Sequence, residues 1–340
     1  IFEKENMCGK RFDGDFQGLE NWSQKTDILD DLNLMNIKIN FQCTPLQRLK
    51  FYDYKFNSSV IDSGKSLLYL VRRGTEKGSL DQGLLKQAQD AGVKIKFNTL
   101  AKKEECHIIS DGPSDADAIT KGITFITKME DTVIMILDDN IAPKGYAYLI
   151  INEGHGCLVT VLFRHFHDER KYFKKMKEYV SKIIDLNISD VKEFEGFGNF
   201  FLEGKYVYNN QLHIGECAGL QDFFLGFGMR YAITSGFLAA QSIIEDKDFE
   251  NLIKERFKSQ LEASIVNRFL FEMLGNRGYQ FLIGIIRFNK NPIRFFYKLY
   301  NISLSKKLLL PFAKFWMRSK KDKHKNCNCS WCRSRIQEKM

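Results

Sequence analysis

The chain has 340 residues, of which 44% are hydrophobic and 27% are charged, and its formal net charge is +9. This composition excludes a disordered chain, and no uninterrupted apolar stretch reaches the roughly 18 residues that indicate a membrane-spanning helix. The five cysteines outside the C-terminal segment stand singly, which favours a reducing compartment over a disulfide framework. We therefore expect a cytoplasmic protein.

The first strong helix pattern covers residues 79–92. Ser79 is a favourable N-cap, Gln82 completes a capping box, and Gly92 ends the apolar periodicity. A strand is expected over 93–98. A second strand, beginning at Cys106, leads into Asp111-Gly112, which is a turn signal.

The pattern changes at residue 122. Four β-rich runs between 122 and 163 follow one another with turns and without helices, which predicts an antiparallel sheet. A charged helix is expected near 168–184, then a hairpin that turns at Asn209-Asn210, and mainly helices after residue 228. These changes place expected domain boundaries near residues 120 and 205.

The segment 215–240, GECAGLQDFFLGFGMRYAITSGFLAA, has the chemistry of an anion and sugar site. A helix N-terminus attracts phosphate, and glycines at 226 and 228 would let it approach the backbone closely. Glu216, at the end of a strand, can accept hydrogen bonds from sugar hydroxyls. The alternative is a tightly packed helix that begins at a glycine turn.

The same segment resembles the C-terminal flavin motif of the geranylgeranyl reductase family. The family pattern is Gly-Asp-Ala-Ala-Gly, then Gly-Glu-Gly-Ile, then Ser-Gly-x-x-Ala-Ala. Glu216 stands where the family usually has Asp, and Cys217 and Phe227 are further departures. The positions that match the pattern are Gly215, Ala218, Gly219, Gly226, Gly228, Ser235, Gly236, Ala239 and Ala240.

The resemblance extends over roughly residues 1 to 300. Residues 1–5 resemble the end of the second strand of a dinucleotide-binding unit, which implies that Glu3 is the ribose ligand. Residues 9–23, which include Arg11, follow as in a subgroup of these proteins, and Asp111 and Gly112 resemble the motif near the flavin diphosphate. The cofactor-binding residues that the resemblance implies are Glu3, Arg11, Asp111, Gly112, Gly215, Glu216, Gly219, Gly226, Phe227, Gly228 and Met229.

The resemblance implies an α/β fold with a Rossmann-like FAD-binding domain, an antiparallel-sheet substrate domain and a helical C-terminal region. The expected ranges are 1–120 together with 205–250 for the FAD-binding domain, 121–204 for the substrate domain, 251–318 for the helical region and 319–340 for a basic tail. The family's G-x-G-x-x-G loop lies upstream of the ribose acid, and no such loop precedes Glu3. We therefore expect the chain as written to lack the first βα unit and to bind FAD poorly without it.

The implied reaction is the reduction of carbon–carbon double bonds in an isoprenoid or other lipid by reduced FAD. The electron donor, NAD(P)H or ferredoxin, stays open, and no catalytic residue is assigned. Tyr146 and Tyr148 stand where the family has a Tyr-x-Trp-x-Phe-Pro motif over the substrate, but the Phe and Pro are missing here. Alternatively, the two tyrosines are alternate residues on one face of an ordinary strand.

The C-terminal region is strongly basic, with 15 lysines and arginines against two acidic residues in 287–340. Its apolar residues fall on helical spacing in two groups, which favours peripheral contact with the inner face of a membrane, without nucleic acid as a partner. The alternative is a pair of core-packing helices with a solvated basic face. The groups are Phe295, Phe296, Leu299 and Tyr300, and then Leu308, Phe312, Phe315 and Trp316.

Four soft ligands lie close together near the end of the chain: His324, Cys327, Cys329 and Cys332. They are candidate ligands for zinc or an iron–sulfur cluster, although a second Cys-x-x-Cys pair is missing. The alternative is a disordered tail that happens to carry cysteines.

We therefore expect an FAD-dependent oxidoreductase similar to geranylgeranyl reductase. One alternative is a flavin monooxygenase or halogenase of the same fold. A second is a non-catalytic protein that binds membranes or nucleic acids through its basic tail.

Overall fold

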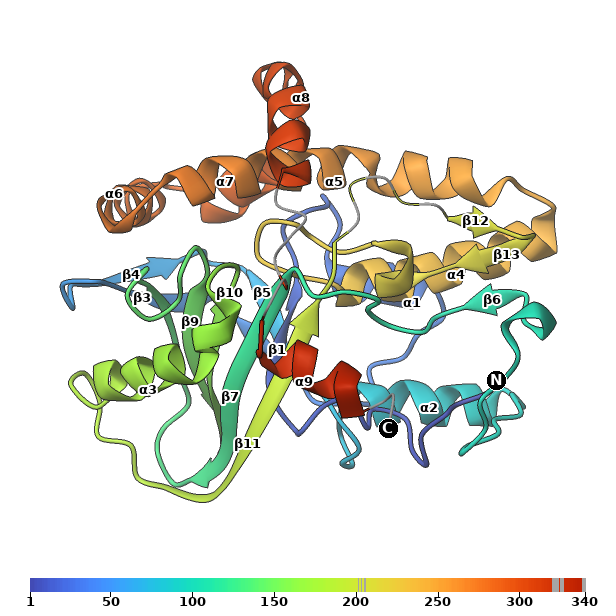
Figure 1. Ribbon diagram of the computed structural model, residues 1–340, viewed down its shortest axis with the longest axis horizontal. Helices are drawn as coiled ribbons and strands as arrows, with labels where there is room; N and C mark the ends of the chain where they lie inside the picture. The colour runs from blue at the N-terminus through green and yellow to red at the C-terminus, as the bar shows by residue number, and fades with distance from the viewer. Residues whose placement is uncertain (201, 203, 205, 320–323, 325–326, 338–340) are drawn as a thin grey trace.

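The computed structural model describes residues 1–200, 202, 204, 206–319, 324 and 327–337. The expected boundary at residue 205 and the tail residues 320–323, 325–326 and 338–340 lie outside these ranges. The fold is α/β, with a large mixed sheet, two small sheets and a helical C-terminal region (Figure 1). The fold class predicted from the sequence is thus confirmed.

The largest sheet contains the four strands predicted between residues 122 and 163, and the first of them begins four residues earlier than predicted. They are β7 (Ala118–Thr127), β8 (Thr132–Leu137), β9 (Tyr146–Asn152) and β10 (His155–Leu162). Its seven strands have the order β11-β7-β10-β9-β8-β3-β4, where β11 is Ile188–Gly198, β3 is Arg48–Asp53 and β4 is Ser58–Asp62. All pairs are antiparallel except β3 with β8. The sheet therefore also includes residues 48–62, which lie outside the range 121–204 expected for it.

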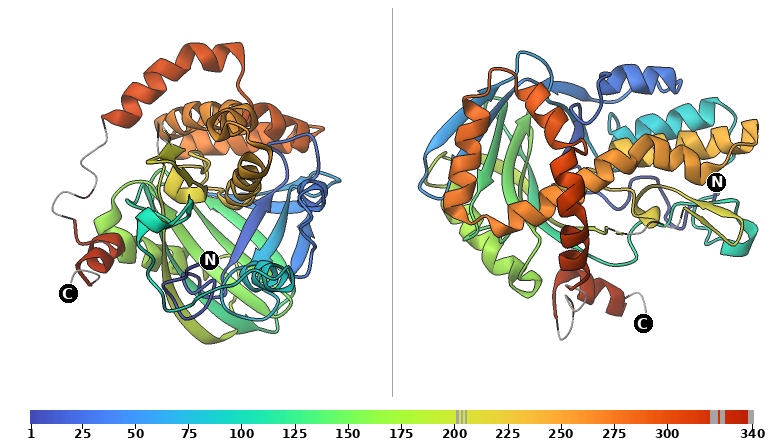
Figure 2. Two further views of the ribbon diagram at one scale, coloured as in Figure 1. Left: turned by 90° about the vertical axis from the view of Figure 1, so that its right-hand side faces the viewer. Right: turned by 90° about the horizontal axis from the view of Figure 1, so that it is seen from above.

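Both faces of this sheet are covered, so the interior strand β10 is buried along almost its whole length. Helix α3 (Glu169–Val180), the charged helix predicted near 168–184, covers one face. The other face packs against a three-stranded sheet of β1 (Phe16–Glu20), β5 (Leu68–Arg72) and β2 (Cys43–Leu46), and against C-terminal helices. Figure 2 shows these helices lying as a layer across the end of the sheets.

Parallel pairing, the mark of a Rossmann-like unit, is limited among the described residues. Strand β6 (Ile108–Ile109) lies parallel to β13 (Gln211–His213), which forms the predicted hairpin with β12 (Val207–Tyr208). Asn209 and Asn210 both adopt positive φ, as the hairpin turn requires. The strand expected over 93–98 is wrong, because only Lys96 pairs there, in a single bridge to Phe2. The preceding helix, α2 (Leu80–Asp90), has the predicted Ser79 cap.

The C-terminal half is helical, as expected. It comprises α4 (Met229–Glu245), α5 (Phe249–Met273), α6 (Asn276–Arg287), α7 (Pro292–Leu299), α8 (Leu304–Arg318) and α9 (Ser330–Gln337). Phe296 and Tyr300, at α7, are 8% and 1% exposed, so this group packs into the core. On α8, by contrast, Phe312 and Phe315 are 67% and 76% exposed. In the described part of the chain, no helix combines the length and the apolar character that crossing a bilayer requires.

A buried cluster of charges joins the start of α4 to three other elements. Arg230 is 4% exposed, and its Nη2 lies 2.5 Å from Oδ2 of Asp31 on α1 (Ile28–Leu34). Glu20 at the end of β1 lies 3.7 Å from Arg230 Nη1, and Arg256 of α5 lies 2.9 Å from Asp31. Burial raises the pKa of Asp31, but the Thr26 hydrogen bond and the two guanidinium groups outweigh it and lower the pKa overall.

We expect Asp31→Asn to lower the free energy of unfolding by about 3 kcal/mol at neutral pH, because a buried guanidinium loses its carboxylate. A lowered pKa in the folded state means that the ionised form stabilises the fold. The advantage of the wild type over Asp31→Asn should therefore be full above pH 3.8, the ordinary value, and disappear as the pH falls further. Urea unfolding at several pH values measures this difference. Asp30→Asn, which changes an exposed neighbour on the same helix, is the control, and equal losses in both variants would contradict the prediction.

Candidate functional site

The carboxylate of Glu216 is held in place at the end of β13. The chain turns through Gly215, whose φ is +61°, into the short 3-10 helix η3 (Gly215–Ala218). Arg11 Nη1 donates to Glu216 Oε2 at 2.6 Å, and the backbone N–H of Asn199 donates to Oε1 at 3.1 Å. These two hydrogen bonds orient Glu216, although its side chain keeps 16% of its surface exposed to a ligand.

Arg11 brings the Asp111-Gly112 turn to the same place. A Cβ atom added to Gly112 would lie 3.5 Å from Arg11 Nη1. This follows from the parallel pairing of β6 with β13, because the carboxyl ends of parallel strands meet at one edge of a sheet. Asp111 itself is half-exposed and pairs with Lys103. Arg11, Gly112 and Glu216 thus form one cluster.

The loop 219–228 is closed by hydrogen bonds from its own residues. Asp222 is fully buried and accepts from the backbone N–H groups of Phe224 and Leu225, at 3.1 and 2.7 Å, and from the hydroxyl of Tyr300. Gly226 has a φ of +83° and its carbonyl accepts from Gln221 Nε2 at 2.8 Å. Burial raises the pKa of Asp222 to about 6, even though these donors favour the ionised carboxylate.

The loop ends at an uncapped helix. Gly228 is the N-cap of α4 and offers no side chain to the first backbone N–H groups, which leaves them free for a ligand. Ser235 Oγ accepts from the backbone N–H of Gly215 at 3.0 Å, and a Cβ on Gly215 would approach Ala232 Cβ to 3.4 Å. The small residues of α4 therefore serve to bring η3 against the helix.

Phe227 and Met229 point toward the core instead of toward Glu216. The ring of Phe227 lies 5.2 Å from that of Trp22 in an edge-to-face contact, and a Cβ on Gly18 of β1 would meet it at 3.1 Å. Met229 is 9% exposed and packs with residues of α1 and β5. Their position fixes the loop on β1.

The residues present fit the polar part of a flavin. Glu216 can accept hydrogen bonds from ribityl hydroxyls, and the free N–H groups at α4 can donate to carbonyl oxygens. Gln221 Oε1 is buried beside Gly226 and Gly228 and has no hydrogen-bond partner among the described residues. An acceptor buried in this way costs free energy unless a ligand donates to it.

Glu3 stands apart from this cluster. Its backbone N–H donates to the carbonyl of Lys96 at 2.9 Å, and its carboxylate accepts from the N–H of Glu5 at 3.0 Å. Burial and the nearby charge of Glu3 raise the pKa of Cys8. Within the described residues these contacts do not join Glu3 to Glu216, so its role as a ribose ligand stays a prediction.

Tyr146 and Tyr148 lie on one face of β9, the face toward the glycine loop. Their rings are 6.2 Å apart, and the hydroxyl of Tyr146 donates to the carbonyl of Leu225 at 2.5 Å. Burial raises the pKa of both phenols well above the ordinary value, so both stay neutral. The sheet therefore presents an apolar, half-buried surface to the loop.

Sequence reasoning did not find Asn199, Gln221 or Asp222. Asn199 contacts Glu216, and Gln221 contacts Gly226 across the loop. The residues next to them in the sequence form no motif that would have predicted these contacts. The sequence around Asp222 did contain a signal, because this acidic residue precedes the apolar run of residues 223–225. A carboxylate in such a setting is either exposed to solvent or buried with hydrogen-bond donors around it.

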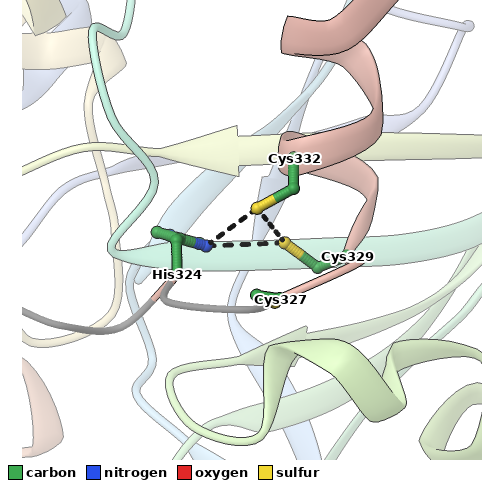
Figure 3. Close-up of side chains that lie close together, drawn as sticks. All are labelled: His324, Cys327, Cys329 and Cys332. Carbon is green, nitrogen blue, oxygen red and sulfur yellow. Dashed lines mark hydrogen bonds between the residues drawn. The ribbon is translucent and has the colours of Figure 1, made fainter.

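The four C-terminal ligand candidates also come together. The ligand atoms of His324, Cys327, Cys329 and Cys332 all lie within 4.8 Å of one another (Figure 3).

Two surface pockets, of about 440 and 520 Å³, lie elsewhere, beside α6 and beside α7 respectively. Neither of these pockets contains a residue of the cluster around Glu216.

The raised pKa of Asp222 has a consequence for stability. Because the folded state holds this proton more tightly than the unfolded state, its contribution is full below pH 3.8 and is lost as the pH rises to about 6. The stability of the wild type relative to Asp222→Asn should fall over this range by roughly 3 kcal/mol. Urea unfolding from pH 4 to pH 7 gives this difference, with Asp185→Asn, at an exposed position, as the control. A difference that does not change with pH would refute the assignment.

Comparison with known proteins shows the fold. No family model and no curated protein sequence matches the chain. A geranylgeranyl bacteriochlorophyll reductase-like protein from Thermoplasma acidophilum is similar in structure, with a TM-score of 0.65, 17% identity, and coverage of 94% of this chain and 91% of that one. A flavoprotein/dehydrogenase from Cytophaga hutchinsonii has a TM-score of 0.55 and 14% identity, with coverage of 94% of this chain and 93% of that one. A tryptophan halogenase from Shewanella frigidimarina has a TM-score of 0.51 and 10% identity, with coverage of 90% of this chain and 84% of that one. The fold that the resemblance implied is the one observed.

Proposed function

We propose that this protein is an FAD-dependent oxidoreductase that reduces carbon–carbon double bonds in an isoprenoid or other lipid. One observation carries the proposal: Glu216, the Gly112 turn and the uncapped start of α4 meet at the carboxyl edge of the parallel pair β6–β13. The motif in residues 215–240 and the fold shared with a flavoprotein support the same cofactor.

The chain's own residues would bind and orient the cofactor. Arg11 pairs with Glu216 and orients it, so that its second carboxylate oxygen can accept from ribityl hydroxyls. The free N–H groups of α4 and the positive end of its helix dipole favour an electron-rich carbonyl edge. When bound, reduced FAD would supply a hydride to one carbon of the double bond, a proton from solvent would add to the other carbon, and an NAD(P)H- or ferredoxin-type donor would restore the electrons of the flavin.

The substrate side is the surface of β9 that faces the glycine loop. Tyr146 and Tyr148 present neutral rings there, and Phe227 and Trp22 close the neighbouring space with apolar surface. Such walls exclude water and favour a hydrocarbon chain over a polar molecule. The similarity to a geranylgeranyl bacteriochlorophyll reductase-like protein supports an isoprenoid group as the first substrate to test.

We also propose that the protein takes its lipid substrate from the surface of an anionic membrane. Phe281 on α6 and Phe288, the residue after α6, are 72% and 81% exposed, and Phe312 and Phe315 on α8 are similarly exposed. Exposed basic residues stand among them at Arg287, Lys290 and Lys307. Figure 1 shows α6 within the helical layer on one side of the molecule and α8 projecting from that layer on the same side. Aromatic residues flanked by basic ones suit an interface of anionic headgroups.

The cofactor is tested by the flavin content of the protein expressed from its whole gene, including any segment that precedes residue 1, and this protein is the wild type of the test. We expect flavin absorbance in the purified wild type and at least about tenfold less in Gly228→Val, because a branched side chain would block the approach to the α4 backbone. Gly284→Val is the control, since a Cβ added there meets nothing within 4 Å. A yellow Gly228→Val variant, or a folded wild type that takes up no FAD, would refute the cofactor assignment.

The reaction is tested with the flavin-loaded protein, a geranylgeranyl lipid and a chemical reductant. Mass spectrometry should find two added hydrogens per double bond reduced. Product that gains oxygen or halogen instead would identify a monooxygenase or a halogenase and refute the reductase.

Membrane contact is tested by sedimentation with lipid vesicles. The wild type should bind vesicles that contain phosphatidylglycerol more tightly than pure phosphatidylcholine, and less tightly as salt rises. Phe312→Ser combined with Phe315→Ser should weaken binding roughly tenfold or more, because two aromatic side chains no longer enter the interface. Ile244→Ser changes a similarly exposed apolar residue on α4 and should have no effect. Binding that does not depend on the two phenylalanines would argue against this surface.

A further inference from the structure

The C-terminal cysteines and His324 form a cluster with the dimensions of a metal site. Cys329 Sγ and Cys332 Sγ are 3.6 Å apart, and they lie 3.5 and 3.6 Å from His324 Nδ1. Cys327 Sγ completes a set of four ligand atoms that all lie within 4.8 Å of one another. Figure 3 shows His324 facing Cys329 and Cys332, with Cys332 on α9 and Cys327 beside them. All three cysteines are free thiols.

The distances among His324 Nδ1, Cys329 Sγ and Cys332 Sγ match a tetrahedral zinc site. Zinc bonds of about 2.3 Å to sulfur and about 2.0 Å to nitrogen place two sulfurs about 3.8 Å apart and a sulfur and a nitrogen about 3.6 Å apart. We propose that His324, Cys327, Cys329 and Cys332 bind one Zn²⁺ ion. The site lies outside the proposed flavin site and does not depend on it.

The imidazole of His324 is prepared for this role. Its Nε2 lies 2.7 Å from the carbonyl oxygen of Ala116. Because a carbonyl can only accept, Nε2 carries the proton, and the lone pair of Nδ1 faces the sulfurs. The ring also stacks on Phe166, with centroids 5.3 Å apart and planes at 14°. An outer hydrogen bond of this kind is what a metal-binding histidine needs to hold its tautomer and orientation.

The segment that carries the cysteines is docked instead of trailing in solvent. Cys329 is fully buried, and the backbone N–H and hydroxyl of the next residue, Ser330, donate to the buried carboxylate of Glu169 on α3. Arg333 donates to Glu169 at 2.8 Å and to Glu195 of β11 at 3.2 Å, and Trp331 makes an edge-to-face contact with Phe197. The expectation of a disordered cysteine-bearing tail is wrong for the described residues.

One imidazole and three thiolates are ligands that favour zinc over other ions, and their number favours a structural site over a catalytic one. Three thiolates exclude magnesium and calcium, which prefer oxygen ligands. An iron–sulfur cluster distributes its four protein ligands over two or more irons and needs wider spacing, whereas these four atoms all lie within 4.8 Å of one another. Four protein ligands fill a tetrahedral zinc and leave no position for substrate, so the ion would fasten α9 to the sheet.

The zinc would also support the region behind Glu216. Ala116 follows the N–H groups of Ser114 and Asp115, which donate to Asn199 Oδ1 at 3.3 and 3.2 Å. Asn199 in turn donates its own N–H to Glu216. Through His324 and Ala116, the metal fixes the loop that holds Asn199 in place.

The test is the metal content of the full chain, purified under reducing conditions without chelators or a histidine tag. We expect about one zinc per chain by plasma mass spectrometry, and after exchange for Co²⁺ the visible bands of a tetrahedral cobalt–thiolate centre. Cys329→Ser and His324→Ala should lower the zinc content roughly tenfold or more. Cys106→Ser, which removes a thiol elsewhere, should not change it.

His324→Cys is the control for loss of zinc through misfolding. It keeps four zinc ligands, so it should retain the zinc that His324→Ala loses. A chelator should also speed tryptic cleavage at Arg333 and Arg335, and added Zn²⁺ should reverse this. Folded wild type that takes up no Zn²⁺, iron in place of zinc, or a Cys329–Cys332 disulfide in the protein as purified would each overturn the proposal.

Discussion

The buried guanidinium of Arg230 is the constraint on which the arrangement of the candidate site depends. It belongs to the first turn of α4, two residues after Gly228, and it pairs with Asp31 of α1 and Glu20 of β1. A charge buried this deeply must stay compensated, so the helix start cannot move relative to β1 without a large cost. Because η3 packs on α4 through Gly215 and Ser235, the same constraint also sets the position of Glu216.

The site that results has a polar side and an apolar side. Glu216, Arg11 and the free N–H groups of α4 supply charge and hydrogen bonds, whereas β9 supplies the neutral rings of Tyr146 and Tyr148. The loop between them keeps its shape because Asp222 bonds its own backbone. This division suits a cofactor with a polar ribityl chain and a substrate with a hydrocarbon chain, which is why we favour a lipid reductase.

The C-terminal region has two different roles in the structure. Helix α7 completes the core through Phe296 and Tyr300, but α8 exposes Phe312 and Phe315 and projects from the molecule (Figure 2). The chain then returns to the large sheet, where α9 and the His324–cysteine cluster dock on α3 and β11. A zinc ion there would anchor the end of the chain, while α8 packs on α5 through Ala313 and Trp316 and leaves Phe312 and Phe315 exposed to a membrane.

The sequence by itself determined the elements whose signals are local. The Ser79 cap, the Asn209-Asn210 turn, the four successive β-rich strands and the glycine-rich start of α4 all depend on residues a few positions apart, and all were predicted. Tertiary structure decided the rest, because distant pairing depends on which surfaces are buried together. It added β3 and β4 to the large sheet, reduced residues 93–98 to one bridge, and placed Phe296 in the core but Phe312 outside. It also brought Asn199 to Glu216 and turned His324 toward three cysteines, because Ala116, from a loop more than 200 residues earlier, accepts its hydrogen bond.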